Sequence, residues 1–219
     1  MKQMNAEETS AQNADQIVLD HLARFYDEKD IELIEKTTED LIHVYAVKAN
    51  KERPYHLLIT AGMSDIPMEV PPGFEEFQFA EMMMLLPEYW PLSETDLEEE
   101  VNNWPIQVLQ TIAELPVPDR TWVSWGHTVS NTDAPFSNFV LFESSLLVYS
   151  ITTSEEFVKI ELPEKTVHIY SAIPLYPEEL EFKIKYGADN LLDKFNRYQT
   201  PEILDCDREN VCNPKHLRF

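Results

Sequence analysis

The sequence predicts a single α+β domain, in which one mixed β-sheet is packed by about three helices. Its 219 residues match the length of one domain, and hydrophobic residues make up 43% of them, which is enough to form a core. Segments typical of strands and segments of helical periodicity follow one another, and neither a linker nor an internal repeat divides the chain. Together these observations favour one layered domain.

The N-terminal half is predicted to contain one helix and four strands. Residues 1–12 are polar, and we expect a flexible N-terminus. A helix is predicted over about 13–26, where Ile17, Leu22 and Phe25 recur at helical spacing. β-branched and aromatic residues then predict strands at 31–35, 41–47 and 55–60. The segment 74–86 changes from alternating to continuously apolar, which is typical of a strand buried on both faces.

The clearest helical stripe runs from Leu97 to Leu115. Thr95 and Glu98 have the spacing of a capping box at its start, and Pro105 predicts a kink or two abutting helices. Further strands are predicted at 121–129, 139–149, 157–162 and 167–175, followed by a helical stripe over 177–195 that is interrupted at 187. These elements place the domain at residues 13–199, and we expect an irregular C-terminal tail at 200–219.

The charge balance limits the partners of this chain. Asp and Glu outnumber Lys and Arg by 40 to 17, which gives a formal net charge of −23. Nucleic acids and anionic membranes bind through clustered Lys and Arg, so we expect neither as a direct partner. The charge instead permits a soluble monomer, or a receptor for a basic partner. The sequence has no signal peptide and no apolar run that could span a bilayer, so we expect a cytoplasmic protein.

No cofactor or metal site is expected. The four glycines form neither a dinucleotide-binding motif nor a P-loop. Cys206, Cys212 and His216 could supply three zinc ligands, but a spacing of five residues between the cysteines is unlike that of structural zinc sites. The alternative is two free thiols in an irregular segment, and so few cysteines fit a reducing compartment.

His127 is the strongest candidate for a catalytic residue, because histidine is the usual general base. It lies in the segment Trp125-Gly126-His127, and Ser124, Ser130 and Asp133 are near it in the sequence. A Ser/His/Asp triad is conceivable, although nothing around His127 resembles a nucleophile elbow. The favoured interpretation is a histidine whose ring donates to a backbone carbonyl beside a turn.

Clustered carboxylates are the candidate contacts for a basic partner. The cluster at the predicted start of the long helix comes first, and the pair before the buried strand comes second. Carboxylates in the first turn of a helix also complement its dipole, so a solvated acidic face is the alternative reading. The candidate residues are Asp96, Glu98, Glu99, Glu100, Glu75 and Glu76.

Several motifs occur in the order and approximate spacing of one known family. The run Tyr-His-Leu-Leu-Ile-Thr-Ala-Gly-Met-Ser over 55–64, followed by Pro-Met at 67–68, resembles a signature of the suppressor-of-fused-like (SUFU) domain family. The segments 79–90, 104–115, 125–128 and 173–192 extend this similarity over about residues 15–198. The positions that carry the resemblance most clearly are Gly62, Met63, Ser64, Pro67, Met68, Glu81, Pro87, Trp90, Trp125, Gly126 and His127.

The resemblance implies a non-enzymatic, protein-binding domain with an α/β mixed sheet and no cofactor. The chain looks like the compact bacterial form of the family. Bacterial members of this type are similar to immunity proteins of polymorphic toxin systems, so the expected partner is a cognate toxin, a basic nuclease domain. Two alternatives stay open, namely a regulatory or scaffold domain without a toxin, and a hydrolase centred on His127.

Overall fold

The computed structural model describes residues 13–36, 42–131 and 134–213. In these residues eight strands form one mixed sheet with the order β1-β2-β3-β4-β8-β6-β5, and β7 pairs with one end of β8. The predicted flexible N-terminus at 1–12 lies outside the described residues. The strands are Ile31–Lys36 (β1), His43–Val47 (β2), Tyr55–Ala61 (β3), Phe79–Pro87 (β4), Thr128–Ser130 (β5), Ser144–Val148 (β6), Lys159–Glu161 (β7) and Thr166–Leu175 (β8).

The centre of the sheet is the parallel pair of β4 and β8, and all the other pairs are antiparallel. Residues 80–86 of β4 are all buried, as predicted from their continuously apolar sequence. Alternate side chains of β4 enter two different cores. Met82 and Met84 lie in the core on one face of the sheet, while Met83 and Leu85 lie in the core on the other.

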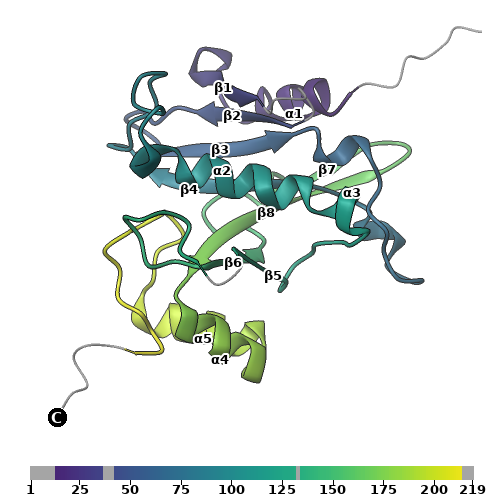
Figure 1. Ribbon diagram of the computed structural model, residues 1–219. Coiled ribbons are helices and arrows are strands. Elements are labelled where there is room, and N and C mark those ends of the chain that lie inside the picture. The colour runs from purple at the N-terminus through teal and green to yellow at the C-terminus, as the bar shows by residue number, and fades with distance from the viewer. Residues whose placement is uncertain (1–12, 37–41, 132–133, 214–219) are drawn as a thin grey trace, which may run out of the picture.

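Helices cover both faces of the sheet (Figure 1). The helix α1 (Ala14–Leu22) packs Ile17, Val18 and Leu22 onto the core of one face. On the opposite face lies α2 (Glu100–Glu114), which continues into the short α3 (Pro116–Asp119). The pair α4 (Pro177–Tyr186) and α5 (Ala188–Tyr198) packs against β6 and β8. The predicted single domain with a mixed sheet is therefore confirmed.

The long helix starts later than the sequence suggested. The capping box of Thr95 and Glu98 is wrong, because α2 begins at Glu100 and residues 94–98 form turns instead. Pro105 lies inside one continuous helix, so the expectation of two abutting helices at this residue is also wrong. The helical break predicted at Gly187 is confirmed, since this residue, with φ +89°, separates α4 from α5.

Strands around the middle of the sequence are shorter than predicted. Of the predicted strand 121–129 only the last two residues belong to β5 (Thr128–Ser130), because the chain turns at Gly126, where φ is +79°. Of the predicted strand 139–149, only Ser144–Val148 is a strand. Residues 136–142 before it form a loop, and its side chains alternate between solvent and the core over 139–142.

The segment 200–213 contains no helix or strand but is attached to the domain. The Leu204 N–H donates to the Leu85 carbonyl at 2.8 Å. Arg208 forms a bidentate ion pair with Glu179, with N–O distances of 2.8 and 2.6 Å, and the Glu179 carboxylate is fully buried. Val211 is buried in the core beside α5. These contacts make the segment part of the folded unit.

Candidate functional site

The family-like motif at 60–64 surrounds a buried carboxylate. Glu81, on β4, is fully buried and accepts four hydrogen bonds of 2.6–3.1 Å. The donors are the Thr60 hydroxyl, the Gly62 N–H, and the N–H and hydroxyl of Ser64. Burial raises the pKa of Glu81, and these donors act in the opposite direction because they stabilise the charged form. The motif thus ties the loop after β3 to the central strand.

The remaining residues of these motifs pack the core beneath α2. Met63 and Met68 are buried, and the Met68 sulfur accepts the Val123 N–H at 3.4 Å, while Pro67 is exposed. The Trp90 N–H donates to the Pro87 carbonyl, and its indole donates to the Asn102 carbonyl at 3.0 Å. These contacts fix loops and the start of α2.

The segment Trp125-Gly126-His127 forms the turn that leads into β5. The Gly126 N–H donates to the Leu147 carbonyl, and the His127 ring lies edge-on to Trp122 at 4.7 Å. The Ser124 hydroxyl is hydrogen-bonded to Tyr170 at 3.2 Å. Within the described ranges no serine hydroxyl bonds to His127, whose pKa is lowered by burial, and Asp133 lies outside them. The geometry therefore offers no Ser–His pair.

The two cysteines lie in the packed segment 200–213, and both are free thiols. Burial raises the pKa of Cys206 to about 11, so this thiol is protonated at neutral pH. No group of three metal-ligating side chains exists in the part of the chain that the structure describes, and His216 lies outside that part.

No described helix is both apolar enough and long enough to traverse a bilayer.

The structure separates the two sets of candidate carboxylates. Glu75 and Glu76 precede β4, whereas Asp96 and Glu98–Glu100 lie beside its other end, where the Trp90 indole meets α2. The nine residues of β4 span about 26 Å, so the two sets lie beside opposite ends of this strand. Glu98, Glu99 and Glu100 are exposed, but Glu100 also accepts the backbone and side-chain N–H groups of Asn138 at 3.2 and 3.3 Å.

Basic residues are nearly missing from the middle of the chain. Between Arg53 and Lys159 the sequence has 17 Asp and Glu but one basic residue, Arg120, which pairs with Glu69 at 3.3 Å. This stretch forms β3 to β6 as well as α2 and α3. Residues 94–120, from the turn before α2 to the residue after α3, hold seven of these carboxylates and Arg120. The exposed side of α2 is therefore acidic, an excess that was not predicted above although the gap in Lys and Arg signals it.

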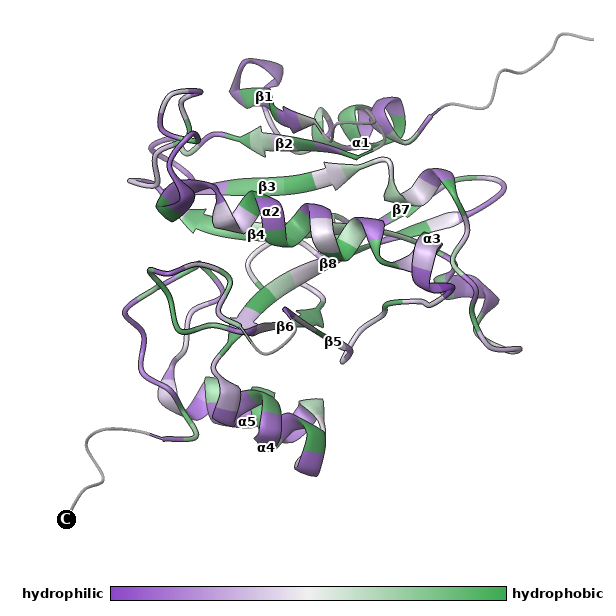
Figure 2. Ribbon diagram, in the orientation of Figure 1, coloured by the Kyte–Doolittle hydropathy of each residue, from purple (hydrophilic) through white to green (hydrophobic). Residues whose placement is uncertain are grey.

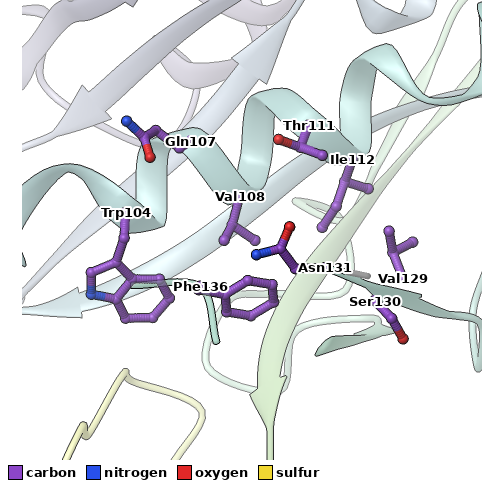
Figure 3. A pocket seen from close by; sticks show the side chains of 9 residues that line it. All are labelled: Trp104, Gln107, Val108, Thr111, Ile112, Val129, Ser130, Asn131 and Phe136. Carbon is purple, nitrogen blue, oxygen red and sulfur yellow. The ribbon is translucent and has the colours of Figure 1, made fainter. Parts of the chain in front are cut away.

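The edge strand β5 faces a shallow recess on this acidic side. About 90 Å³ of space lies between α2 and β5, lined by Val108 and Ile112 of the helix, Val129 of the strand, and Phe136 (Figure 3). In Figure 3 the Val129 side chain points toward α2 and the Ser130 side chain points away. Gln107, Thr111 and Asn131 also line the recess, so apolar and polar side chains share it beside a sheet edge.

The edge of β5 also offers backbone hydrogen-bonding groups. The Leu147 N–H donates to the His127 carbonyl, and the Asn131 N–H donates to the Glu143 carbonyl. Odd-numbered residues here therefore bond toward β6, which directs the N–H and C=O groups of Thr128 and Ser130 outward. No described strand pairs with that edge. Such an edge can accept an added strand.

Comparison with known proteins identifies the fold. The family model described as suppressor of fused protein (SUFU) matches residues 38–209, more than half of the chain. The chain belongs to the SUFU family. A crystal structure of a SUFU homologue from Neisseria gonorrhoeae FA 1090 superposes with a TM-score of 0.65 at 19% identity, covering 90% of this chain and 96% of that one.

Two further SUFU structures share the fold. The Sufu–Fu complex matches with a TM-score of 0.58 at 15% identity, over 91% of this chain and 92% of that one. Drosophila Suppressor of Fused gives a TM-score of 0.58 at 14% identity, and this chain spans 51% of its length. A search of curated proteins finds no match. These likenesses establish the SUFU architecture of the chain.

Proposed function

We propose that this SUFU-family chain is a non-enzymatic immunity protein that binds a cognate toxin domain with a basic surface and neutralises it. The observation that carries the proposal is the acidic side of α2, where residues 94–120 contain seven carboxylates and a single Arg. A toxin that acts on nucleic acid has a basic groove, and an acidic surface can occupy such a groove in place of the phosphates.

The α2–β5 recess supports a specific binding mode. An extended segment of the partner would pair with the outward backbone groups of Thr128 and Ser130, and one of its apolar side chains would enter the recess beside Val129. Backbone pairing provides affinity, and the carboxylates accelerate encounter with a basic partner. Neutralisation then needs occlusion alone, over an interface of about 1,200–2,000 Å².

A second candidate is a regulatory or scaffold domain without a toxin. One observation favours it, since a structure of similar fold is that of the Sufu–Fu complex, in which a SUFU protein binds another protein. Both candidates use the same surface, and they differ in whether the partner is toxic by itself. The hydrolase centred on His127 has no such support, because no Ser–His pair exists among the described residues.

The experiment that tests the proposal is co-expression with a candidate toxin, namely a basic C-terminal domain sought among the proteins encoded by neighbouring genes. We expect that domain to stop growth alone, and we expect this chain to restore growth and form a complex that weakens with salt. A toxic domain that still kills cells containing the folded chain would overturn the immunity function. A tight complex with a non-toxic domain would favour the regulatory candidate.

A matched pair of variants tests the strand-addition mode. Ser130→Pro removes one outward N–H of β5 and leaves the bonds toward β6 in place, and proline is tolerated on edge strands. Ser130→Ala is the control, because it removes the hydroxyl and keeps the N–H. We expect the proline variant to bind at least tenfold more weakly than the alanine variant. Equal affinities of the two variants would show that the partner does not pair with the edge of β5.

A further inference from the structure

Two large apolar side chains project into solvent beside the start of α2. Phe139 is 64% exposed and Leu141 is 70% exposed, while the neighbouring Val140 and Phe142 are 7% and 1% exposed. We call residues 136–142 the anchor loop. It carries a green, hydrophobic stretch in Figure 2, next to the helix. Most of the surface of these two residues therefore stays in contact with solvent.

The anchor loop is held in one conformation by contacts at both ends and in its middle. The Phe136 N–H donates to the Phe142 carbonyl at 2.8 Å, and the Phe136 ring stacks on Trp104 at 5.8 Å. The backbone and side-chain N–H groups of Asn138 both donate to the Glu100 carboxylate. A loop fixed in this way loses little conformational entropy when a partner binds.

The charge around the anchor loop determines what can bind there. The Asn138–Glu100 contact places the loop beside the start of α2, and the two residues before Glu100, Glu98 and Glu99, are exposed carboxylates. A second copy of this chain would bring these carboxylates against their own counterparts, and an anionic membrane would be repelled. A basic protein surface complements them. Apolar anchors within an acidic rim therefore match a basic partner that has an apolar pocket.

We propose that Phe139 and Leu141 are the apolar anchors of the partner interface, and that they insert into a pocket within the basic surface of the toxin. This inference rests on the proposed function and adds the residues that hold the complex together. Interface energy concentrates in a few well-buried apolar and aromatic side chains, while the surrounding charges mainly set specificity and the rate of encounter. The carboxylates steer the partner, and the anchors slow its dissociation.

The test measures binding of the purified candidate toxin domain used in the co-expression experiment. The double variant Phe139→Ala/Leu141→Ala is compared with Ile184→Ala and Ile151→Ala, whose side chains are 72% and 89% exposed elsewhere on the molecule. All four side chains are exposed, so each variant should keep the wild-type unfolding midpoint. We expect the double variant to raise Kd at least about 30-fold, chiefly through faster dissociation, and the controls to change Kd less than about threefold.

The outcomes separate the two proposals. If the wild-type chain protects cells and the double variant binds as tightly as the controls, the anchor assignment is overturned and the immunity function stands. If the wild-type chain neither binds nor protects, the immunity function is overturned, and so is the anchor assignment that rests on it. Weaker binding by the double variant alone, with unchanged stability, supports both.

Discussion

Glu81 and Glu98 carry the same carboxylate group, but Glu81 is fully buried and Glu98 is exposed. Four donors surround Glu81, and a bidentate arginine neutralises the second buried carboxylate, Glu179. The surface carboxylates of Glu98 and Glu99 have water around them. The interior carboxylates of this chain therefore stabilise its fold, whereas the surface carboxylates are free to select its binding partner.

The largest expected effect comes from breaking the buried ion pair. Arg208→Met leaves the fully buried Glu179 without its counterion, so we expect the free energy of unfolding to fall by about 3–5 kcal/mol. Urea denaturation measures the loss. The double variant Arg208→Met/Glu179→Gln leaves no unpaired charge and should recover much of it. A single variant that loses less than about 1 kcal/mol would show that the pair does not fix the C-terminal segment.

The Glu81 cluster should follow with a smaller effect. In Glu81→Gln the amide NH₂ replaces one acceptor oxygen and meets donors, so we expect a loss of about 2–3 kcal/mol. Glu75→Gln serves as the surface control, because Glu75 is exposed, and it should stay within about 0.5 kcal/mol of the wild type. Equal losses in chemical denaturation would contradict the contrast between interior and surface carboxylates.

Lowering the pH should reduce the free energy of unfolding through His168, which is buried in its neutral form. Its Nε2–H donates to the Glu76 carbonyl at 3.1 Å, so Nδ1 accepts the Tyr149 hydroxyl at 2.8 Å and has no place for a proton. Burial lowers the pKa of His168 below its usual 6.5. Below pH 6.5 this histidine therefore binds more protons in the unfolded chain than in the folded chain. The free energy of unfolding then falls as the pH falls, by at most about 1.4 kcal/mol per pH unit for this group.

The variant His168→Gln isolates that contribution. Its free energy of unfolding, compared with that of the wild type between pH 7.5 and 5.5, should depend less steeply on pH. Tyr149→Phe removes the hydroxyl that Nδ1 accepts and should also flatten the dependence. Identical pH profiles for all three proteins would exclude His168 as a source of acid sensitivity.

The smallest effect on stability is expected at the surface carboxylates. Glu98→Lys/Glu99→Lys spares Glu100, which holds the anchor loop, and should change the free energy of unfolding by less than about 0.5 kcal/mol. Association with the basic domain should slow about tenfold at low salt, and the difference should shrink as salt rises. Stopped-flow mixing at two salt concentrations measures it, and an unchanged rate would place the interface elsewhere.

Much of the fold could be predicted from local patterns, because the central elements combine a clear period with burial. The stripe of α2 and the continuous apolar run of β4 are examples. Predictions failed where tertiary contacts decide the conformation. Residues 121–127 read as a strand but turn at Gly126, and the anchor loop alternates like a strand although no partner strand pairs with it.

The candidate site was less predictable for the same reason. Nothing in the residue types of Thr128 and Ser130 marks them as a binding site. They lie on an open sheet edge only because β5 is the last strand in the order of the sheet. The donors of Glu81 lie 17–21 residues away from it in the sequence. The sequence therefore shows both motifs but does not show that one of them surrounds the carboxylate of the other. The gap in Lys and Arg between Arg53 and Lys159 was visible in the sequence and indicates the acidic face directly.

The contacts of residues 204–211 also set an order of events during synthesis on the ribosome. Every strand and helix described here is translated before Arg208, yet Glu179 has no counterion and the Leu85 carbonyl has no donor from Leu204 until this segment emerges. In a nascent chain that ends after α5, burial of the Glu179 carboxylate without its counterion would be energetically unfavourable. The domain can therefore complete its fold only after residues 204–211 have left the ribosome and reached Glu179 and Leu85.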